Sequence, residues 1–294
     1  MEHIEAAGVH SGDSACVLPP HSIAAPMLAE IMTATKAMAA ELGVVGLMNV
    51  QYAIKNDRLY VLEVNPRASR TVPFVSKATG VPLAKLATKA MLGRSLASLD
   101  FTRERAPEHI SVKEAVLPFD RFPDVDTLLG PEMKSTGEVM GIDADFGISY
   151  AKSQLAAGQR LPIAGTVFIS VKESDKKGVL PLADRFHRIG FKILATRGTA
   201  RLLSAHQIPN VTIKKVSMGR PHVVDAIKNG EIQLIINTGT GDTPRRDGYM
   251  IRRAAIKFGI PYATTLAGAM AMSKGIAALK QKKFTVSALQ DYTY

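Results

Sequence analysis

The sequence predicts a protein of two folded parts, the first of α+β structure and the second of α/β structure with a mostly parallel sheet. Three observations lead to this prediction. A β-hairpin pattern occurs in the first part, strand and helix patterns alternate in the second, and 294 residues suffice for two hydrophobic cores. We expect the boundary between Gln159 and Gly165, where proline and glycine interrupt the pattern.

Two strands are expected in the first part, at Val45–Ile54 and Leu59–Val64, joined by the turn Asn56-Asp57. A turn at this position places Gln51 directly opposite Glu63. A helix is expected before the hairpin, and its apolar residues are interpreted as a core-facing stripe. That helix runs from about Pro26 to Leu42, and the stripe consists of Met27, Ile31, Met38 and Leu42.

The second strand of this hairpin ends in polar residues. Strand side chains alternate between faces, so Glu63 and Asn65 share a face with Gln51, while Leu62 and Val64 are expected in the core. The three polar side chains offer one carboxylate and two amide oxygens. Magnesium prefers such hard ligands and commonly takes one or two carboxylates together with substrate phosphates.

Two guanidinium groups, Arg67 and Arg70, follow the strand, and a guanidinium can bind phosphate or carboxylate through two parallel hydrogen bonds. A surface hairpin that ends in solvated charge is one interpretation of this pattern. The combination of carboxylate, amides and two arginines favours the other, which is a site for a magnesium-bound phosphoryl group.

The second part alternates between strand-like and helical runs, which predicts a mostly parallel sheet covered on both faces. The strands are expected at Thr166–Val171, Phe191–Ala195 and Leu234–Asn237, and the helices around Gly178–Arg188, Thr199–His206, Asp225–Asn229 and Tyr249–Phe258.

The charge of the chain is concentrated in this second part. Residues 1–160 hold 16 Lys and Arg against 18 Asp and Glu, a net charge of −2, whereas residues 161–294 hold 21 against 8, a net charge of +13. A basic domain predicts anionic partners. Nucleic acid is disfavoured because the sequence lacks an aromatic RNA-binding pair, zinc-ligand spacing and tryptophan, so we expect small phosphorylated ligands.

Ligands of parallel sheets bind beyond the carboxyl ends of the strands. The loops expected there are Thr196–Thr199 and Asn237–Gly241, whose hydroxyls and glycines could donate to a phosphate, with Lys176 and Lys215 adding positive charge. Each loop taken alone is also typical of ordinary caps and turns. Two such loops in one basic domain favour anion binding.

Several segments carry a resemblance to a known family. The run Leu62–Pro82 resembles the metal-binding end of an ATP-grasp domain, specifically the second one in the large subunit of carbamoyl phosphate synthetase. The same family is indicated by His10–Ala15, Gly46–Gln51, Ser111–Glu114 and Leu129–Gly141. The resemblance covers nearly the whole chain, which corresponds to the C-terminal portion of that longer subunit.

The resemblance implies three segments in the chain. Residues 1–92 would be the C-terminal part of an ATP-grasp domain, residues 93–159 a connecting part of the carbamoyl-phosphate synthetic component, and residues 160–294 a methylglyoxal-synthase-like regulatory domain with a Rossmann-like, doubly wound parallel sheet. The lobe that completes the ATP clasp would precede Met1, so the chain alone is expected to be inactive.

The implied activity is that of an ATP-dependent ligase, which transfers the γ-phosphoryl group of ATP to carbamate. The product, carbamoyl phosphate, serves arginine and pyrimidine biosynthesis. Gln51, Glu63 and Asn65 would hold Mg²⁺ or Mn²⁺, and Arg67 and Arg70 would stabilise the transferring oxygens. ATP would also contact Gln51 and Glu63, and its ribose would contact Gly8, Val9, His10 and Ser11. A lone histidine such as His10 is otherwise interpreted as a loop-packing residue.

The resemblance also implies ligands of the second part. Regulatory domains of this family sense nucleotides such as UMP and IMP, and the matching positions are Lys176, Thr196, Thr199, Lys215 and Asn237. Gly239 replaces a hydroxyl residue found in some members, which leaves the effector open. The catalytic aspartate arrangement of methylglyoxal synthase is not evident in residues 237–242, which favours sensing over catalysis.

Some members bind ornithine between the two parts. The corresponding contacts here would be Glu5, Asp13, Glu114 and Thr264; without the resemblance these residues would be interpreted as solvated surface. The family pairs its large subunit with a glutaminase small subunit.

The remaining features concern location and alternatives. No run of about 18 apolar residues occurs, so no membrane span is expected. The single cysteine, Cys16, excludes an internal disulfide and predicts a cytoplasmic location without cysteine chemistry. A purely regulatory, nucleotide-binding module is the alternative to the enzyme hypothesis, nucleic-acid binding ranks third, and the oligomeric state, including a homo-oligomer, stays open.

Overall fold

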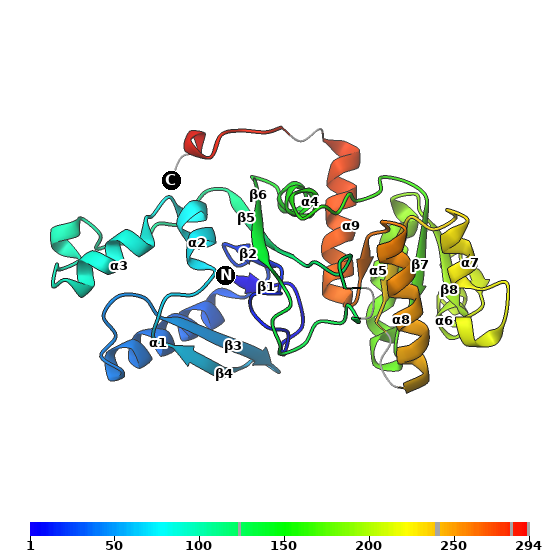
Figure 1. Ribbon diagram of the computed structural model, residues 1–294, viewed down its shortest axis with the longest axis horizontal. Coiled ribbons are helices and arrows are strands. Elements are labelled where there is room, and N and C mark those ends of the chain that lie inside the picture. Colours follow the sequence, from blue (N-terminus) through cyan, green and yellow to red (C-terminus); the bar gives the residue numbers. More distant parts are fainter. Residues whose placement is uncertain (123–124, 239–241, 283–284, 293–294) are drawn as a thin grey trace.

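The computed structural model describes residues 1–122, 125–238, 242–282 and 285–292. Figure 1 shows an elongated molecule. A hairpin with helices α1 and α3 lies at one end, a parallel sheet with its helices lies at the other, and helices α4 and α9 lie between them. No helix among the described residues is both long and apolar enough to cross a membrane.

An antiparallel sheet with the strand order β1-β2-β5-β6 lies near the middle of the molecule. Its strands are β1 (Glu2–His3), β2 (Cys16–Leu18), β5 (Ile110–Val116) and β6 (Gly137–Asp143). Helix α4 (Phe146–Ala156) follows β6 directly, and the carboxylate of Asp145 caps this helix by accepting a hydrogen bond from the Ile148 amide. The loops next to β2 and β6 form part of the candidate site, and this sheet holds them in position.

The predicted hairpin is present as β3 (Asn49–Lys55) and β4 (Arg58–Asn65). Asn56 and Asp57 both have positive φ, as a two-residue hairpin turn requires. The expected start of the first strand at Val45 is wrong, because the chain leaves helix α1 (Ala25–Glu41) through turns with positive φ at Gly43 and Gly46.

Two core assignments in this region are also wrong. None of the seventeen described residues of α1 is buried, so its apolar stripe does not face a core. Leu62 on β4 is 50% exposed and Leu42 after α1 is 55% exposed. Few of the described residues pack against this hairpin and helix, so their apolar side chains have no hydrophobic core to enter. The antiparallel sheet is reached from the hairpin through α2 (Val72–Thr79), α3 (Leu83–Met91) and the short 3₁₀ helix η1 (Ala97–Leu99).

The second part contains the predicted parallel sheet, with the strand order β11-β10-β7-β8-β9. Its strands are β7 (Thr166–Ser170), β8 (Lys192–Thr196), β9 (Val211–Ile213), β10 (Leu234–Asn237) and β11 (Tyr262–Ala263). Its helices are η2 (Glu173–Asp175), α5 (Lys176–Arg188), α6 (Arg197–Ala205), η3 (Val216–Met218), α7 (Val223–Lys228), α8 (Asp242–Lys257) and α9 (Leu266–Gln281), and η4 (Leu289–Asp291) follows near the C-terminus.

Helices cover both faces of this sheet, so the doubly wound α/β class is confirmed. One core joins α5, α6 and α9 to strand residues such as Ile169 and Ile236, and a second core joins α7 and α8 to Phe168 and Ile235. The three predicted strands lie within one residue of their expected bounds, and the predicted helices are present but begin earlier. The short edge strands β9 and β11 and the whole of α9 were not predicted.

One hydrophobic core spans the two parts of the chain. Its members come from the antiparallel sheet, α4, the parallel sheet and α9, and they include Val112, Phe146, Tyr150, Ile169, Ile236, Met272 and Ile276. Helices α4 and α9 pack directly on each other (Figure 1). The parallel sheet is therefore held firmly against the part of the chain that carries the hairpin.

Candidate functional site

The hairpin brings together part of the predicted phosphoryl cluster. Strand register pairs Gln51 with Glu63, as predicted from the turn. Asn65 Nδ2 donates to Glu63 Oε1 at 2.8 Å, so these two side chains lie together on one face of β4. Arg67 Nη2 donates to the Asn65 amide oxygen at 3.3 Å, and Arg67 also lines a cavity of about 570 Å³ with Gln51. These four residues are therefore neighbours.

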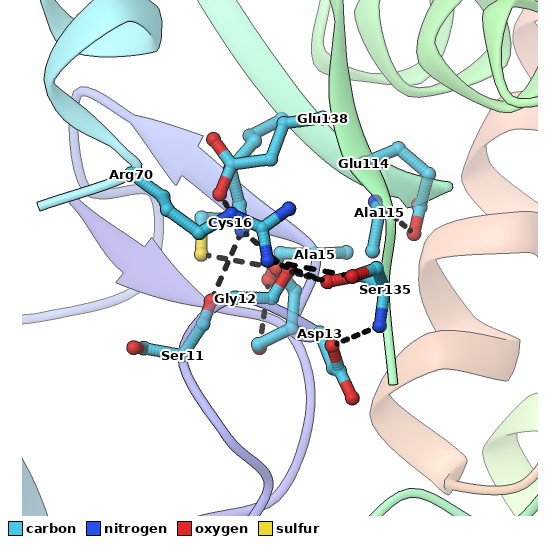
Figure 2. Close-up of polar contacts among 12 residues, drawn as sticks. Ser11, Gly12, Asp13, Ala15, Cys16, Arg70, Glu114, Ala115, Ser135 and Glu138 are labelled. Carbon is cyan, nitrogen blue, oxygen red and sulfur yellow. Dashed lines mark hydrogen bonds and ion pairs between the residues drawn. The ribbon is translucent and has the colours of Figure 1, made fainter. Parts of the chain in front are cut away.

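Arg70 does not join this cluster by any contact of the described residues. Its Nη1 points to the carbonyl and hydroxyl oxygens of Ser135, each at 3.4 Å, and also contacts the sulfur of Met133. Figure 2 shows Arg70 reaching across to Ser135, next to Gly12 and Asp13. The guanidinium is thus a link between the segment after β4 and the segment before β6.

The loop before β2 is held by buried polar groups. Asp13 is 1% exposed, and its two carboxylate oxygens accept hydrogen bonds from the amides of Lys134 at 2.7 Å and Ser135 at 2.9 Å. His10 Nδ1 accepts from the Gly12 amide at 3.1 Å, which is the loop-packing role expected of a lone histidine.

The side chain of Lys113 on β5 also binds the loop before β2. Its side chain is fully buried, and its Nζ donates to the Ser11 carbonyl at 3.0 Å and the Gly12 carbonyl at 3.4 Å. The ammonium also pairs with Glu138 at 3.5 Å. Nearby Cys16 is fully buried, and burial raises the pKa of its thiol to about 11, in keeping with a cysteine that carries no chemistry.

The four residues predicted to contact ornithine line a single cavity of about 620 Å³: Glu5, Asp13, Glu114 and Thr264. Burial is the main cause that raises the pKa of Glu114 to about 8, and the neighbouring Glu5 carboxylate contributes to this rise. Burial also raises the pKa of Glu5, whose carboxylate accepts a hydrogen bond from Thr265 at 3.0 Å. A cationic ligand in this cavity would favour the ionised form of both acids, so the two carboxylates could pair with an ammonium group.

A third cavity, of about 240 Å³, lies at the carboxyl edge of the parallel sheet. All five predicted effector residues line it: Lys176, Thr196, Thr199, Lys215 and Asn237. Thr196 and Asn237 end two strands, Lys176 begins α5, and Thr199 lies in the first turn of α6. The strand-end rule therefore brings together residues that are far apart in sequence.

The cavity is polar and partly preformed. Thr196 Oγ1 donates to the Ser170 hydroxyl at 3.1 Å, and Asn237 Nδ2 donates to the Ser170 carbonyl at 3.4 Å. The ammonium of Lys176 pairs with the exposed Glu173 at 2.5 Å, so an incoming anion would compete with a weakly held carboxylate. Such a pocket can bind a phosphate group through hydroxyl, amide and ammonium donors.

Comparison with known proteins finds two family domains. Residues 1–99 match the carbamoyl-phosphate synthase L chain ATP-binding domain, and residues 178–264 match the MGS-like domain. Over 99% of its length the chain is 56% identical to the carbamoyl phosphate synthase large chain of Archaeoglobus fulgidus, 53% to that of Nostoc sp. and 54% to that of Methanothermobacter thermautotrophicus. Along nearly its whole length the chain therefore corresponds to part of a carbamoyl phosphate synthase large chain.

The chain covers only part of the length of those relatives. It spans 27% of the Archaeoglobus fulgidus and Nostoc sp. large chains and 28% of the Methanothermobacter thermautotrophicus one. The expected resemblance to the C-terminal portion of the large subunit, with a partial ATP-grasp domain and an MGS-like domain, is confirmed. The expected segment boundaries and the roles of individual residues stay predictions.

The matched ATP-binding domain implies a nucleotide ligand, and the hairpin residues offer oxygen donors that would fit a cation bound to its phosphates. Gln51, Glu63 and Asn65 present one carboxylate and two amide oxygens, which are the hard donors that Mg²⁺ or Mn²⁺ takes. The described residues contain no group of three or more His, Cys, Asp or Glu side chains able to hold a metal ion. A cation here would therefore depend on phosphate oxygens for most of its charge neutralisation.

Three residues that line the 240 Å³ cavity were not singled out from the sequence. Ser170 ends β7, Lys172 follows it, and Asp247 lies on α8; all three line the 240 Å³ cavity. Ser170 and Lys172 could have been found by applying the strand-end rule to β7 as well. Asp247 carried no such signal, because it reaches the pocket from a helix. Gly239, the position that leaves the effector open, lies outside the described residues.

Proposed function

We propose that this chain forms the carbamate-phosphorylating and effector-binding portion of a carbamoyl phosphate synthase large chain. Its first part would help transfer the γ-phosphoryl group of ATP to carbamate, and its second part would tune that step by binding a nucleotide. The proposed division is a partial ATP-grasp domain at 1–92, a connecting part at 93–159 and a regulatory domain at 160–294. Identity above 50% to three large chains supports the assignment.

The phosphoryl-transfer role rests on positioning and charge rather than on a nucleophilic side chain. Glu63 and Asn65, held together by their hydrogen bond, would hold a divalent cation with Gln51. When bound, Mg²⁺ or Mn²⁺ would neutralise charge on the phosphate oxygens. Arg67, already hydrogen-bonded to Asn65, would face the transferring group, and Gly8, Val9, His10 and Ser11 would lie along the ATP ribose.

Arg70 would act differently from Arg67. Because it contacts Ser135 rather than the Glu63 cluster, it would position the segment before β6 and would reach substrate only after leaving that contact. Both arginines keep a fixed positive charge at any working pH, as stabilisation of a phosphoryl group requires.

The observation that carries the regulatory half of the proposal is the 240 Å³ cavity lined by all five predicted effector residues. UMP or IMP is the proposed ligand, with its phosphate at Thr196, Thr199 and the lysines. The alternative is a chain that binds such nucleotides without any catalysis. It gains support from the apolar residues that α1 and β4 leave exposed in the described part of the chain, such as Leu62.

A reciprocal pair of variants in the complete large chain tests both halves. Glu63→Gln should abolish carbamate phosphorylation and keep UMP binding, because Gln cannot supply the anionic ligand. Lys215→Ala should keep phosphorylation and lose the response to UMP. Glu30→Gln on α1 and Lys192→Ala at the amino end of β8 are matched controls. Full turnover by Glu63→Gln would contradict the proposed metal-binding role of Glu63. An unchanged UMP response in Lys215→Ala would contradict the proposed effector site.

Further proposals concern ligands and partners. Ornithine would bind with its ammonium groups at Glu5, Asp13, Glu114 and Thr264, in the 620 Å³ cavity between the two parts. A glutaminase small subunit would supply ammonia, the product would enter arginine and pyrimidine biosynthesis, and the location would be cytoplasmic.

Nucleic-acid binding through the basic second part is the third hypothesis, after the enzyme and the regulatory module. It would be favoured by steeply salt-dependent binding to unrelated duplexes with which mononucleotides do not compete.

A further inference from the structure

A fully buried arginine connects the nucleotide cavity to the first part of the chain. Arg252 on α8 is 0% exposed. Its Nη1 donates to Asn237 Oδ1 at 3.0 Å, and Asn237 lines the cavity. Its Nε and Nη2 donate to the two carboxylate oxygens of Asp126 at 2.9 Å and 2.8 Å. One planar guanidinium therefore holds a ligand-facing amide and a carboxylate from outside the predicted regulatory domain at the same time.

The geometry at Arg252 is closely constrained. Gly248 lies one helical turn before it, and a Cβ added to Gly248 would lie 2.7 Å from Arg252 Nη1 and 2.9 Å from Asn237 Oδ1. Only a glycine leaves room for this contact. The two-point pairing with Asp126 is also strict in direction, because the donors of a guanidinium are fixed in one plane.

Asp126 in turn belongs to a segment that contacts Asp13 and Arg70. Lys134 Nζ donates to the Asp126 carbonyl at 3.3 Å and to the Leu128 carbonyl at 2.8 Å, which folds residues 126–134 into one unit. The backbone amides of Lys134 and Ser135 bind Asp13, and Ser135 receives Arg70. Figure 2 shows this end of the segment, with Asp13, Ser135 and Arg70 in contact.

We infer that the Arg252–Asp126 pair couples occupancy of the nucleotide cavity to the position of segment 126–135, and through it to Asp13 and Arg70. The inference rests on the proposed nucleotide site. A ligand that draws the Asn237 amide toward itself removes an acceptor from a buried charge, and Arg252 must then move with Asn237 or with Asp126. Movement of Arg252 in either direction would displace Asp126, and with it the hydrogen-bonded segment 126–135. Arg252 and Asp126 are thus positioning residues and do not touch substrate.

The test is hydrogen exchange at single amides of the 294-residue chain, measured with and without saturating UMP. The amide of Lys172, which donates to Thr238 at 3.2 Å, reports on the cavity, and the amides of Lys134 and Ser135 report on the distant segment. In the wild type we expect UMP to change exchange at both places, by at least about five-fold at the distant amides.

Asp126→Asn should keep the UMP response at Lys172 and reduce the distant response to less than about two-fold. Asp143→Asn is the matched control, because Asp143 is a carboxylate of similar exposure, 26% against 22%, that pairs with Lys152 at 2.8 Å. Arg252→Lys, which keeps the buried charge but cannot bridge two partners in one plane, decides the question if Asp126→Asn does not fold.

Each outcome has one meaning. No UMP response at Lys172 in the wild type contradicts the proposed nucleotide site, and the coupling falls with it. A response at Lys172 without one at Lys134 and Ser135 overturns the coupling alone. The coupling is also overturned if the distant response persists in the variant that folds.

Discussion

At the residue scale, the polar groups that matter most are those buried beside the cavities. Asp13, Lys113 and Arg252 are each at most 1% exposed, and each binds partners from a distant segment. A buried charge is tolerated only when its partners are in place, so these residues fix the loops that they contact. Glu114 differs, because its burial favours the neutral form of the acid.

Glu114 gives a pH-dependent prediction for stability. Its pKa is raised from 4.5 to about 8 in the folded state, so the folded chain binds this proton more tightly than the unfolded chain does. Stability from this group is complete below its unfolded pKa and is lost as pH rises toward the folded value. Glu114→Gln stays neutral, and it should therefore gain stability relative to the wild type between about pH 5 and about pH 8.

Thermal unfolding across that pH range measures this effect. Glu132→Gln is the control, because Glu132 is an exposed glutamate in the segment before β6. Parallel curves of unfolding temperature against pH for the wild type and Glu114→Gln would contradict the raised pKa.

Sequence reasoning reached some of these residues and missed others for a physical reason. The pairing of Gln51 with Glu63 could be predicted, because a two-residue turn fixes the register of a hairpin. The contact between Arg70 and Ser135 could not, because it joins residues 65 positions apart through packing rather than a local pattern. Lys113 carries no sign of its burial in an otherwise ordinary strand.

At the element scale, close approach between β6 and α4 places the antiparallel sheet against the shared core. A Cβ added to Gly141 on β6 would meet the Ser149 carbonyl oxygen, and would lie 2.5 Å from the Ser153 nitrogen, both on α4. Gly137 begins the same strand, and a Cβ there would meet nothing within 4 Å. The two glycines form an internal comparison.

Gly141→Ala should lower the free energy of unfolding by about 1–3 kcal/mol or more, because the helix must move away from the strand. Gly137→Ala should stay within about 0.5 kcal/mol of the wild type. Urea unfolding of both variants measures the difference. Equal stability of the two variants would show that α4 does not pack on β6 at this distance.

The bounds of an element could be predicted reliably where the strand is buried on both faces of the sheet and is therefore continuously apolar. The bounds of β10 were predicted correctly, since a strand in the middle of a parallel sheet is apolar throughout. The core assignment of α1 failed, because an apolar stripe indicates a partner surface without showing that the partner is present. The edge strands β9 and β11 have three and two residues and are too short to show a period.

At the scale of the whole molecule, the excess positive charge lies in the part of the chain that contains the proposed nucleotide cavity. The net charge of +11 arises entirely in the second part, where Lys176 and Lys215 line the cavity. The shared core and the Arg252–Asp126 pair place that cavity in mechanical contact with the hairpin part. The two-part organisation could be predicted from composition, but the continuous core between the parts could not, because it depends on the unpredicted helix α9.

The most direct test is a calorimetric titration of the 294-residue chain with UMP and with IMP at fixed salt. Thr199→Ala removes the hydroxyl of a buried residue that lines the cavity, and Thr212→Ala removes the hydroxyl of an exposed residue on the edge strand β9 as a control. We expect saturable binding of UMP or IMP by the wild type and by Thr212→Ala, and binding at least about ten-fold weaker in Thr199→Ala. Absence of saturable binding in the wild type, or equal affinity in Thr199→Ala, would contradict this expectation.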